Sequence, residues 1–185
     1  TPGEVGSYRP PSRALLTDAE GAYGVAICDS RAQTITALDP AGRTLWARAF
    51  PYARSVRTAR GLPGTLLVCS LFEARSWRHD RHGVTEELGP DRPFWPTSDA
   101  EDRRLLDDAC LFRGHDGERC VVLVTRRQGE PGTEERQPRL TLFGADGGAR
   151  WHAWLPARTR GLGVASTPSV DLIVVATVEG DLFVL

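Results

Sequence analysis

The chain has 185 residues, of which 41% are hydrophobic, so it is long enough to bury a core as one domain or as one piece of a larger one. Its net charge of −1 excludes a strong overall basic field of the kind that holds nucleic acid. No apolar run reaches the ~18 residues that a membrane-spanning helix needs.

Short apolar runs follow one another along the chain, and turn residues separate them. The runs are 23–28 (YGVAIC), 34–38 (TITAL), 44–50 (TLWARAF), 64–70 (GTLLVCS), 120–125 (CVVLVT), 139–143 (RLTLF) and 172–177 (LIVVAT). They are too short for helices and rich in β-branched and aromatic residues, which favours strands. Pro, Asp and Gly in DPAG and GADGG are typical of the tight turns that join such strands. The sequence therefore predicts an all-β protein.

Two polar stretches interrupt this pattern. Residues 96–104 and 126–138 are charged or rich in Gly and Pro, which predicts solvated loops. Residues 98–109 (SDAEDRRLLDDA) combine helix-capping residues with leucines, and we expect one short helical turn there. The acidic residues of this stretch lack the ordered oxygen spacing of a calcium loop and are interpreted as a charged surface element.

The chain also repeats itself. Residues 35–51 align without a gap on residues 140–156, an offset of 105, which pairs Gly42 with Gly147 and Trp46 with Trp151. Weaker copies appear at offsets of 41 and 147. The copies are anchored at Leu38, His79, Phe143 and Leu185. A period near 42 residues, with about four strands in each unit, is typical of the blades of a β-propeller.

The segments ITALDPAGRTLW and STPSVDLIVVATVEGDLFVL resemble the PQQ-like, or quinoprotein-type, propeller repeat. The resemblance is good over 24–51 and 139–185 and poor over 76–110. It implies a β-propeller of about four PQQ-like blades, which we expect to be part of a larger ring. The expected blades are roughly 12–51, 52–95, 105–156 and 157–185, with closure by 1–11 or by another segment.

Four positions are predicted to be structural parts of the repeat. Gly42 and Gly147 fall in turns, and Trp46 and Trp151 are expected to fill the space between neighbouring blades, where a tryptophan buries ~150–250 Å². The last copy has three strands at most, and nothing in it corresponds to Trp46. We therefore expect a missing strand, supplied by residues 6–10 or by a segment of another chain or of a longer polypeptide.

Little in the sequence predicts chemistry, and no catalytic, cofactor-binding or metal-binding residue is assigned. His79, Asp80 and His82 in RHDRHG are candidate metal ligands, but this stretch aligns with the turn DPAG and is interpreted as a turn. His152, between Trp151 and Ala153, is interpreted as a packed or edge histidine. By resemblance, quinone-dependent enzymes of this fold carry adjacent cysteines, and this chain has no such pair.

The cysteines predict the compartment. Cys28, Cys69 and Cys120 lie in apolar strand-like segments, and with Cys110 they form no C-x-x-C pair. Buried free thiols behave as small hydrophobes, so a reducing, cytoplasmic location is expected.

The resulting hypothesis is a non-catalytic propeller scaffold or adaptor that mediates protein–protein interaction in a bacterial multiprotein system. Its partner would be another protein chain or the remaining segments of a longer polypeptide, with no nucleic acid and no membrane. The polar loops and the aromatic pair Phe94 and Trp95 are candidate partner contacts. The alternatives are a sensor that binds a small ligand in the central hole of the ring and, less favoured, a quinone-dependent or hydrolytic enzyme.

Overall fold

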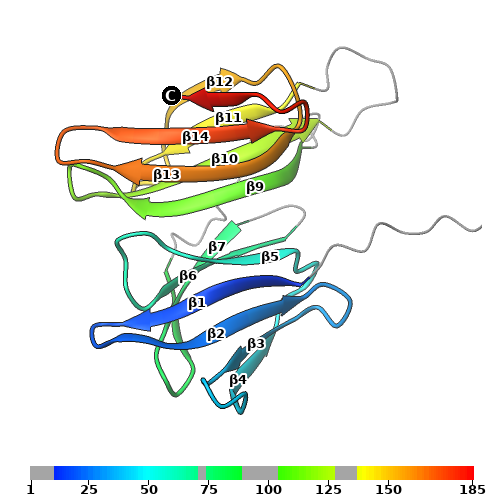
Figure 1. The fold of residues 1–185 in the computed structure, drawn as a ribbon, viewed down its shortest axis with the longest axis vertical. Coiled ribbons are helices and arrows are strands. Elements are labelled where there is room, and N and C mark those ends of the chain that lie inside the picture. Colours follow the sequence, from blue (N-terminus) through cyan, green and yellow to red (C-terminus); the bar gives the residue numbers. More distant parts are fainter. Residues whose placement is uncertain (1–10, 71–73, 89–103, 128–136) are drawn as a thin grey trace, which may run out of the picture.

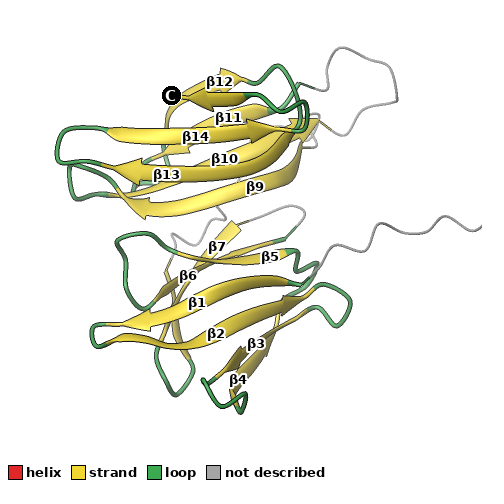
Figure 2. Ribbon diagram, in the orientation of Figure 1, coloured by secondary structure: helices red, strands yellow, loops and turns green. Residues whose placement is uncertain are grey.

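The structure is a computed structural model that describes residues 11–70, 74–88, 104–127 and 137–185. Strands joined by turns and loops make up this part of the chain (Figure 2). In these ranges, no helix is long and apolar enough to cross a lipid bilayer.

The strands form antiparallel sheets in which neighbours in sequence are neighbours in space (Figure 1). The first sheet contains β1 (Ser12–Asp18), β2 (Gly21–Asp29), β3 (Thr34–Leu38) and β4 (Thr44–Ala49). The second contains β5 (Ser55–Thr58), β6 (Thr65–Cys69), β7 (Ala74–His79) and β8 (Val84–Leu88). The third contains β9 (Arg104–Arg113), β10 (Arg119–Arg127), β11 (Arg139–Phe143) and β12 (Ala149–Trp154). The fourth contains β13 (Thr159–Ser166), β14 (Asp171–Thr177) and β15 (Leu182–Val184).

Three hydrophobic clusters hold the sheets together, one between each consecutive pair. Leu16 and Ile35 of the first sheet pack with Val68 and Trp77 of the second. The next clusters join the second sheet to the third and the third to the fourth. Alternate residues of each strand supply these clusters, because successive side chains of a strand point to opposite faces. This arrangement of four blades confirms the predicted all-β propeller.

The offsets read from the sequence recur in the strand bounds. Strand β3 begins at Thr34 and β11 begins at Arg139, 105 residues later, and the same interval separates the ends of β4 and β12. The repeat therefore marks equivalent strands in the first and third blades.

The predicted helical turn over 98–109 is wrong for the part that the structure describes. Leu105 to Ala109 belong to β9, which pairs with β10 along its length. Residues with helix-capping preference form a strand here because the hydrogen-bonded ladder and the buried Leu106 and Ala109 outweigh local propensity. The loop expected at 126 also begins later, since β10 extends to Arg127.

Candidate functional site

The two repeat tryptophans occupy equivalent strands but differ in environment. Trp46 on β4 is 9% exposed and belongs to the cluster between the first and second sheets, which also contains Trp77 and has Val84 packed against it. Trp151 on β12 remains 36% exposed. Trp77 of β7 and Val84 of β8 help to cover Trp46. Among the described residues, the fourth sheet has one strand fewer than the second to cover Trp151.

An apolar groove of about 550 Å³ lies beside Trp151. Leu142 and Ala153 of the third sheet form one wall of the groove, and Ile173 and Leu185 of the fourth sheet form the other. The groove thus lies between the two sheets and reaches the residue that follows β15. Among the described residues, the fourth sheet has three strands.

The rim of the groove is polar. His115 donates its backbone N–H to Asp171 Oδ1 over 3.1 Å, and its Nδ1 lies 2.9 Å from Asp171 Oδ2. Burial alone would raise the pKa of Asp171, but the hydrogen bonds from His115 and Ser166 hold it below its usual value. The carboxylate is thus ionised at neutral pH and fixes the end of the groove.

Strand β15 presents an open edge and an apolar outer face. It pairs with β14 on one side, and no described strand pairs with its other side. Leu182 and Val184 point away from the third sheet and are 66% and 58% exposed. Unpaired backbone groups and exposed apolar side chains together are a template for pairing with another strand.

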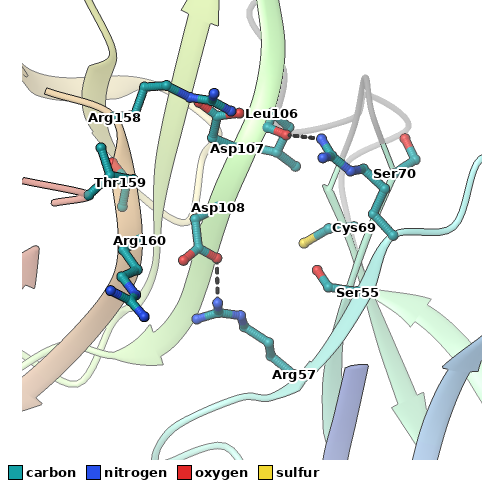
Figure 3. A pocket seen from close by; sticks show the side chains of 12 residues that line it. Ser55, Arg57, Cys69, Ser70, Leu106, Asp107, Asp108, Arg158, Thr159 and Arg160 are labelled. Atoms are coloured by element: carbon teal, nitrogen blue, oxygen red, sulfur yellow. Dashed lines mark hydrogen bonds and ion pairs between the residues drawn. The ribbon is translucent and has the colours of Figure 1, made fainter. Parts of the chain in front are cut away.

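A second, polar cavity of about 360 Å³ opens where the strands β5, β9 and β13 begin (Figure 3). Arginines and aspartates gather in it from three blades. The charged residues that line it are Arg54, Arg57, Asp107, Asp108, Arg158 and Arg160. Ser55, Cys69, Ser70, Leu106, Thr159 and Val178 complete the lining.

Two of these charges form a partly buried ion pair across the cavity. Arg57 Nη2 lies 2.5 Å from Asp108 Oδ1, and Arg57 Nη1 donates to the backbone oxygen of Leu162 over 3.1 Å. Burial raises the pKa of Asp108, and the Arg57 charge opposes this rise. Burial alone would lower the pKa of Arg57, but Asp108 and neighbouring thiols raise it. The guanidinium therefore keeps its charge and links the second, third and fourth blades.

Arg54 and Arg60 precede and follow Arg57 at three-residue spacing, and they too bind other blades. Arg54 Nη1 donates to the backbone oxygen of Leu106 over 3.0 Å, and Arg60 Nη1 donates to the backbone oxygen of Val164. Their guanidinium groups therefore bind backbone carbonyls of neighbouring blades. They do not form the continuous exposed stripe that a nucleic acid would need.

The histidines and the turn at 78–83 lie away from this cavity. His79 is 3% exposed, and its Nδ1 lies 2.5 Å from the hydroxyl oxygen of Tyr23 on the first sheet. Asp80 Oδ1 accepts the backbone N–H groups of His82 and Gly83, which is the geometry of a turn closed by an aspartate. Among the described residues, no group of three or more His, Cys, Asp and Glu side chains is placed to hold a metal ion.

The predicted turn glycines have the backbone conformation that favours glycine. Gly42 has φ of 79° and Gly147 has φ of 76°. In both turns an aspartate side chain, Asp39 or Asp146, accepts a backbone N–H group two residues further on. His152 lies exposed on β12. Phe94 and Trp95 fall outside the described residues.

Sequence reasoning missed the residues of the polar cavity. Asp107 and Asp108 were interpreted as part of a charged surface element, which is wrong, because their side chains are only 9% and 11% exposed. No role is assigned to Arg158 and Arg160 from the sequence. These arginines follow the aspartates by about 50 residues, and no known motif has a spacing that connects residues of three successive blades.

The chain matches no family model and no curated protein in sequence. In structure it is similar to BBS1N in a crystal structure with ARL6DN, with a TM-score of 0.60 and 14% identity, over 98% of this chain and 55% of that chain. It is similar to a luciferin-regenerating enzyme, with a TM-score of 0.53 and 14% identity, over 98% of this chain and 62% of the enzyme. It is also similar to the WD40 domain of SCAP from fission yeast, with a TM-score of 0.50 and 11% identity, over 88% of this chain and 36% of that chain.

These likenesses show the fold, which is a β-propeller. The chain spans between about a third and three fifths of the length of these three structures. Identities of 11–14% carry no function across, and one of the similar structures is an enzyme.

Proposed function

We propose that this chain is a non-catalytic propeller scaffold, built from PQQ-like repeats, that binds a protein partner through the open side of its fourth blade. The partner is another protein chain or a further segment of a longer polypeptide, in a bacterial multiprotein system. The supporting observation is the contrast between Trp46, which is covered, and Trp151, which is partly exposed at an apolar groove near β15, a strand whose outer edge no described strand pairs with.

The chemistry of this surface defines what fits it. An extended segment antiparallel to β15 would pair with the free backbone groups of the edge, and its apolar side chains would enter the groove against Trp151. Main-chain hydrogen bonds would supply affinity, and the side chains seated in the groove would supply specificity.

The hydrogen-bond pattern identifies the residue that tests this proposal. Leu185 and Ile173 exchange both backbone hydrogen bonds, at 2.9 Å each. Residues alternate between bonded and non-bonded pairs in an antiparallel ladder, so the N–H of Val184 points away from β14 toward the free edge. Val184→Pro removes that donor and leaves the pairing with β14, whereas Val184→Thr keeps it and is the matched control.

The experiment places a photo-crosslinking amino acid at position 185 of the chain in its source cells and maps the crosslinked peptides by mass spectrometry. We expect crosslinks to one extended, alternately apolar segment. They should be lost in Val184→Pro and retained in Val184→Thr. Identical crosslinks in both variants, or crosslinks scattered over unrelated peptides, would refute the strand-accepting edge.

A further inference from the structure

The polar cavity contains groups whose hydrogen-bonding capacity the described residues do not use. Asp107 Oδ1 accepts from Arg126 Nε over 2.8 Å, but Asp107 Oδ2 is buried and has no hydrogen-bond partner. Thr159 Oγ1, also on the cavity wall, is buried without a partner. Such atoms cost free energy unless something donates to them or accepts from them.

The backbone aims these groups into the cavity. Asp107 is the extra residue where the register between β9 and β10 shifts, and Arg160 has the same place between β13 and β14. A bulge of this kind turns a side chain away from the regular alternation of the strand and is common beside functional sites. Strands β9 and β13 thus each have a β-bulge at the same cavity.

The cavity also contains arginines that form no ion pair with a described residue. Arg57 is not one of them, because it forms an ion pair with Asp108, and Arg54 donates to the backbone oxygen of Leu106. Arg158 and Arg160 are exposed side chains on the wall formed by the start of β13, and no described residue forms an ion pair or side-chain hydrogen bond with either of them (Figure 3). Two guanidinium groups from residues separated only by Thr159 suit a carboxylate or another planar anion.

The guanidinium groups of Arg158 and Arg160 and the carboxylate oxygen of Asp107 together favour one class of ligand. A simple dianion such as phosphate would satisfy the arginines, but it would offer no strong donor to Asp107 Oδ2 and would be repelled by that carboxylate. A simple amine would satisfy Asp107 and be repelled by the arginines. A molecule with a carboxylate and an ammonium group satisfies both.

We propose that the cavity binds a small zwitterion, an α-amino acid in the simplest case. Its carboxylate contacts Arg158 and Arg160, and its ammonium group donates to Asp107 Oδ2. A volume of about 360 Å³ lies at the lower end of the range for small-molecule sites and accepts a ligand of this size. Binding does not depend on the strand-accepting edge, because the cavity lies at the start of β9 and the groove lies beyond its end at His115.

The test uses the twenty L-amino acids as probes, at pH 7.5, with the unfolding midpoint followed by intrinsic tryptophan fluorescence. The best amino acid is then compared by calorimetry with its N-acetyl derivative, which lacks the ammonium group, and with its amide, which lacks the carboxylate. We expect one or more amino acids to raise the midpoint, and each derivative to bind at least tenfold more weakly.

The variants locate the site. Arg160→Ala should weaken binding of the amino acid at least tenfold. Asp107→Asn should weaken it similarly while leaving binding of the N-acetyl derivative unchanged, a pattern that loss of folding cannot produce. Arg13→Ala, at an exposed arginine outside the cavity, should change nothing. The proposal is overturned if no amino acid shifts the midpoint, if either derivative binds as well as its parent, or if Arg160→Ala and Arg13→Ala behave alike.

Discussion

Replacing Gly24 by alanine should destabilise the first blade. A Cβ atom at this position would lie 2.4 Å from the backbone oxygen of Leu38, whereas ordinary contacts begin near 3.4 Å. Strands β2 and β3, which pair at Val25 and Leu38, would have to separate by about 1 Å. Overpacking costs about 1–3 kcal/mol and each weakened hydrogen bond about 0.5–1.5 kcal/mol. Alanine also lowers the conformational entropy of the unfolded chain relative to glycine, which stabilises the folded variant by about 0.4–1 kcal/mol.

With one weakened hydrogen bond, the net loss is about 0.5–4 kcal/mol, equivalent to a fall in Tm of roughly 1–16 °C for a chain of this size. Urea denaturation and calorimetry would measure it. Gly163→Ala is the matched control, since a Cβ atom there meets nothing within 4 Å and the change should be neutral or slightly stabilising. If the two variants unfold within about 0.5 kcal/mol of each other, the close approach of β2 and β3 is refuted.

Three further predictions concern buried ionisable groups. Burial lowers the pKa of His79 below 6.5, so on acidification the unfolded chain binds a proton at this histidine before the folded chain does. The free energy of unfolding should therefore fall as the pH drops below 6.5. Denaturation curves at about pH 5–7.5 should show a weaker pH dependence for His79→Phe. Burial raises the pKa of Cys28 to about 11 and that of Cys69 to about 12, so a thiol reagent at pH 8 should label both far more slowly than in urea; equal rates would contradict their burial. Arg57→Met leaves the largely buried Asp108 without its counter-ion and should destabilise the fold by about 1–3 kcal/mol, since the pair is partly open to solvent, and adding Asp108→Leu should recover most of this loss; a double variant no more stable than the single one would contradict the pairing.

The blades could be predicted because each is a local unit. Alternation within short runs indicates strands, and turns such as Asp39–Gly42 connect strands that are adjacent in both sequence and space. The offset of 105 residues is visible because equivalent positions, such as Trp46 and Trp151, meet similar packing demands in each blade. The helical turn predicted over 98–109 is wrong for its described part for the opposite reason, since pairing with β10 decides that segment and local preference does not.

The cavity could not be predicted, because its residues come from three blades. Nothing in the sequence around Asp107 indicates that it lines the same cavity as Arg158, and the bulges at Asp107 and Arg160 depend on the register with β10 and β14. Arg54, Arg57 and Arg60 follow one another at three-residue spacing along the chain. Their separate acceptors on β9 and β13 became visible only in the assembled sheets.

The sequence by itself determined that this chain forms strands, where the turns fall and how many blades repeat. These properties follow from the order of apolar, polar and turn residues within about forty positions, where the chain contacts itself locally. The tertiary structure decided which charges are buried together, why Trp151 is exposed while Trp46 is covered, and where a ligand or a strand could bind. Those properties depend on contacts between blades, and such contacts join residues that are far apart along the chain.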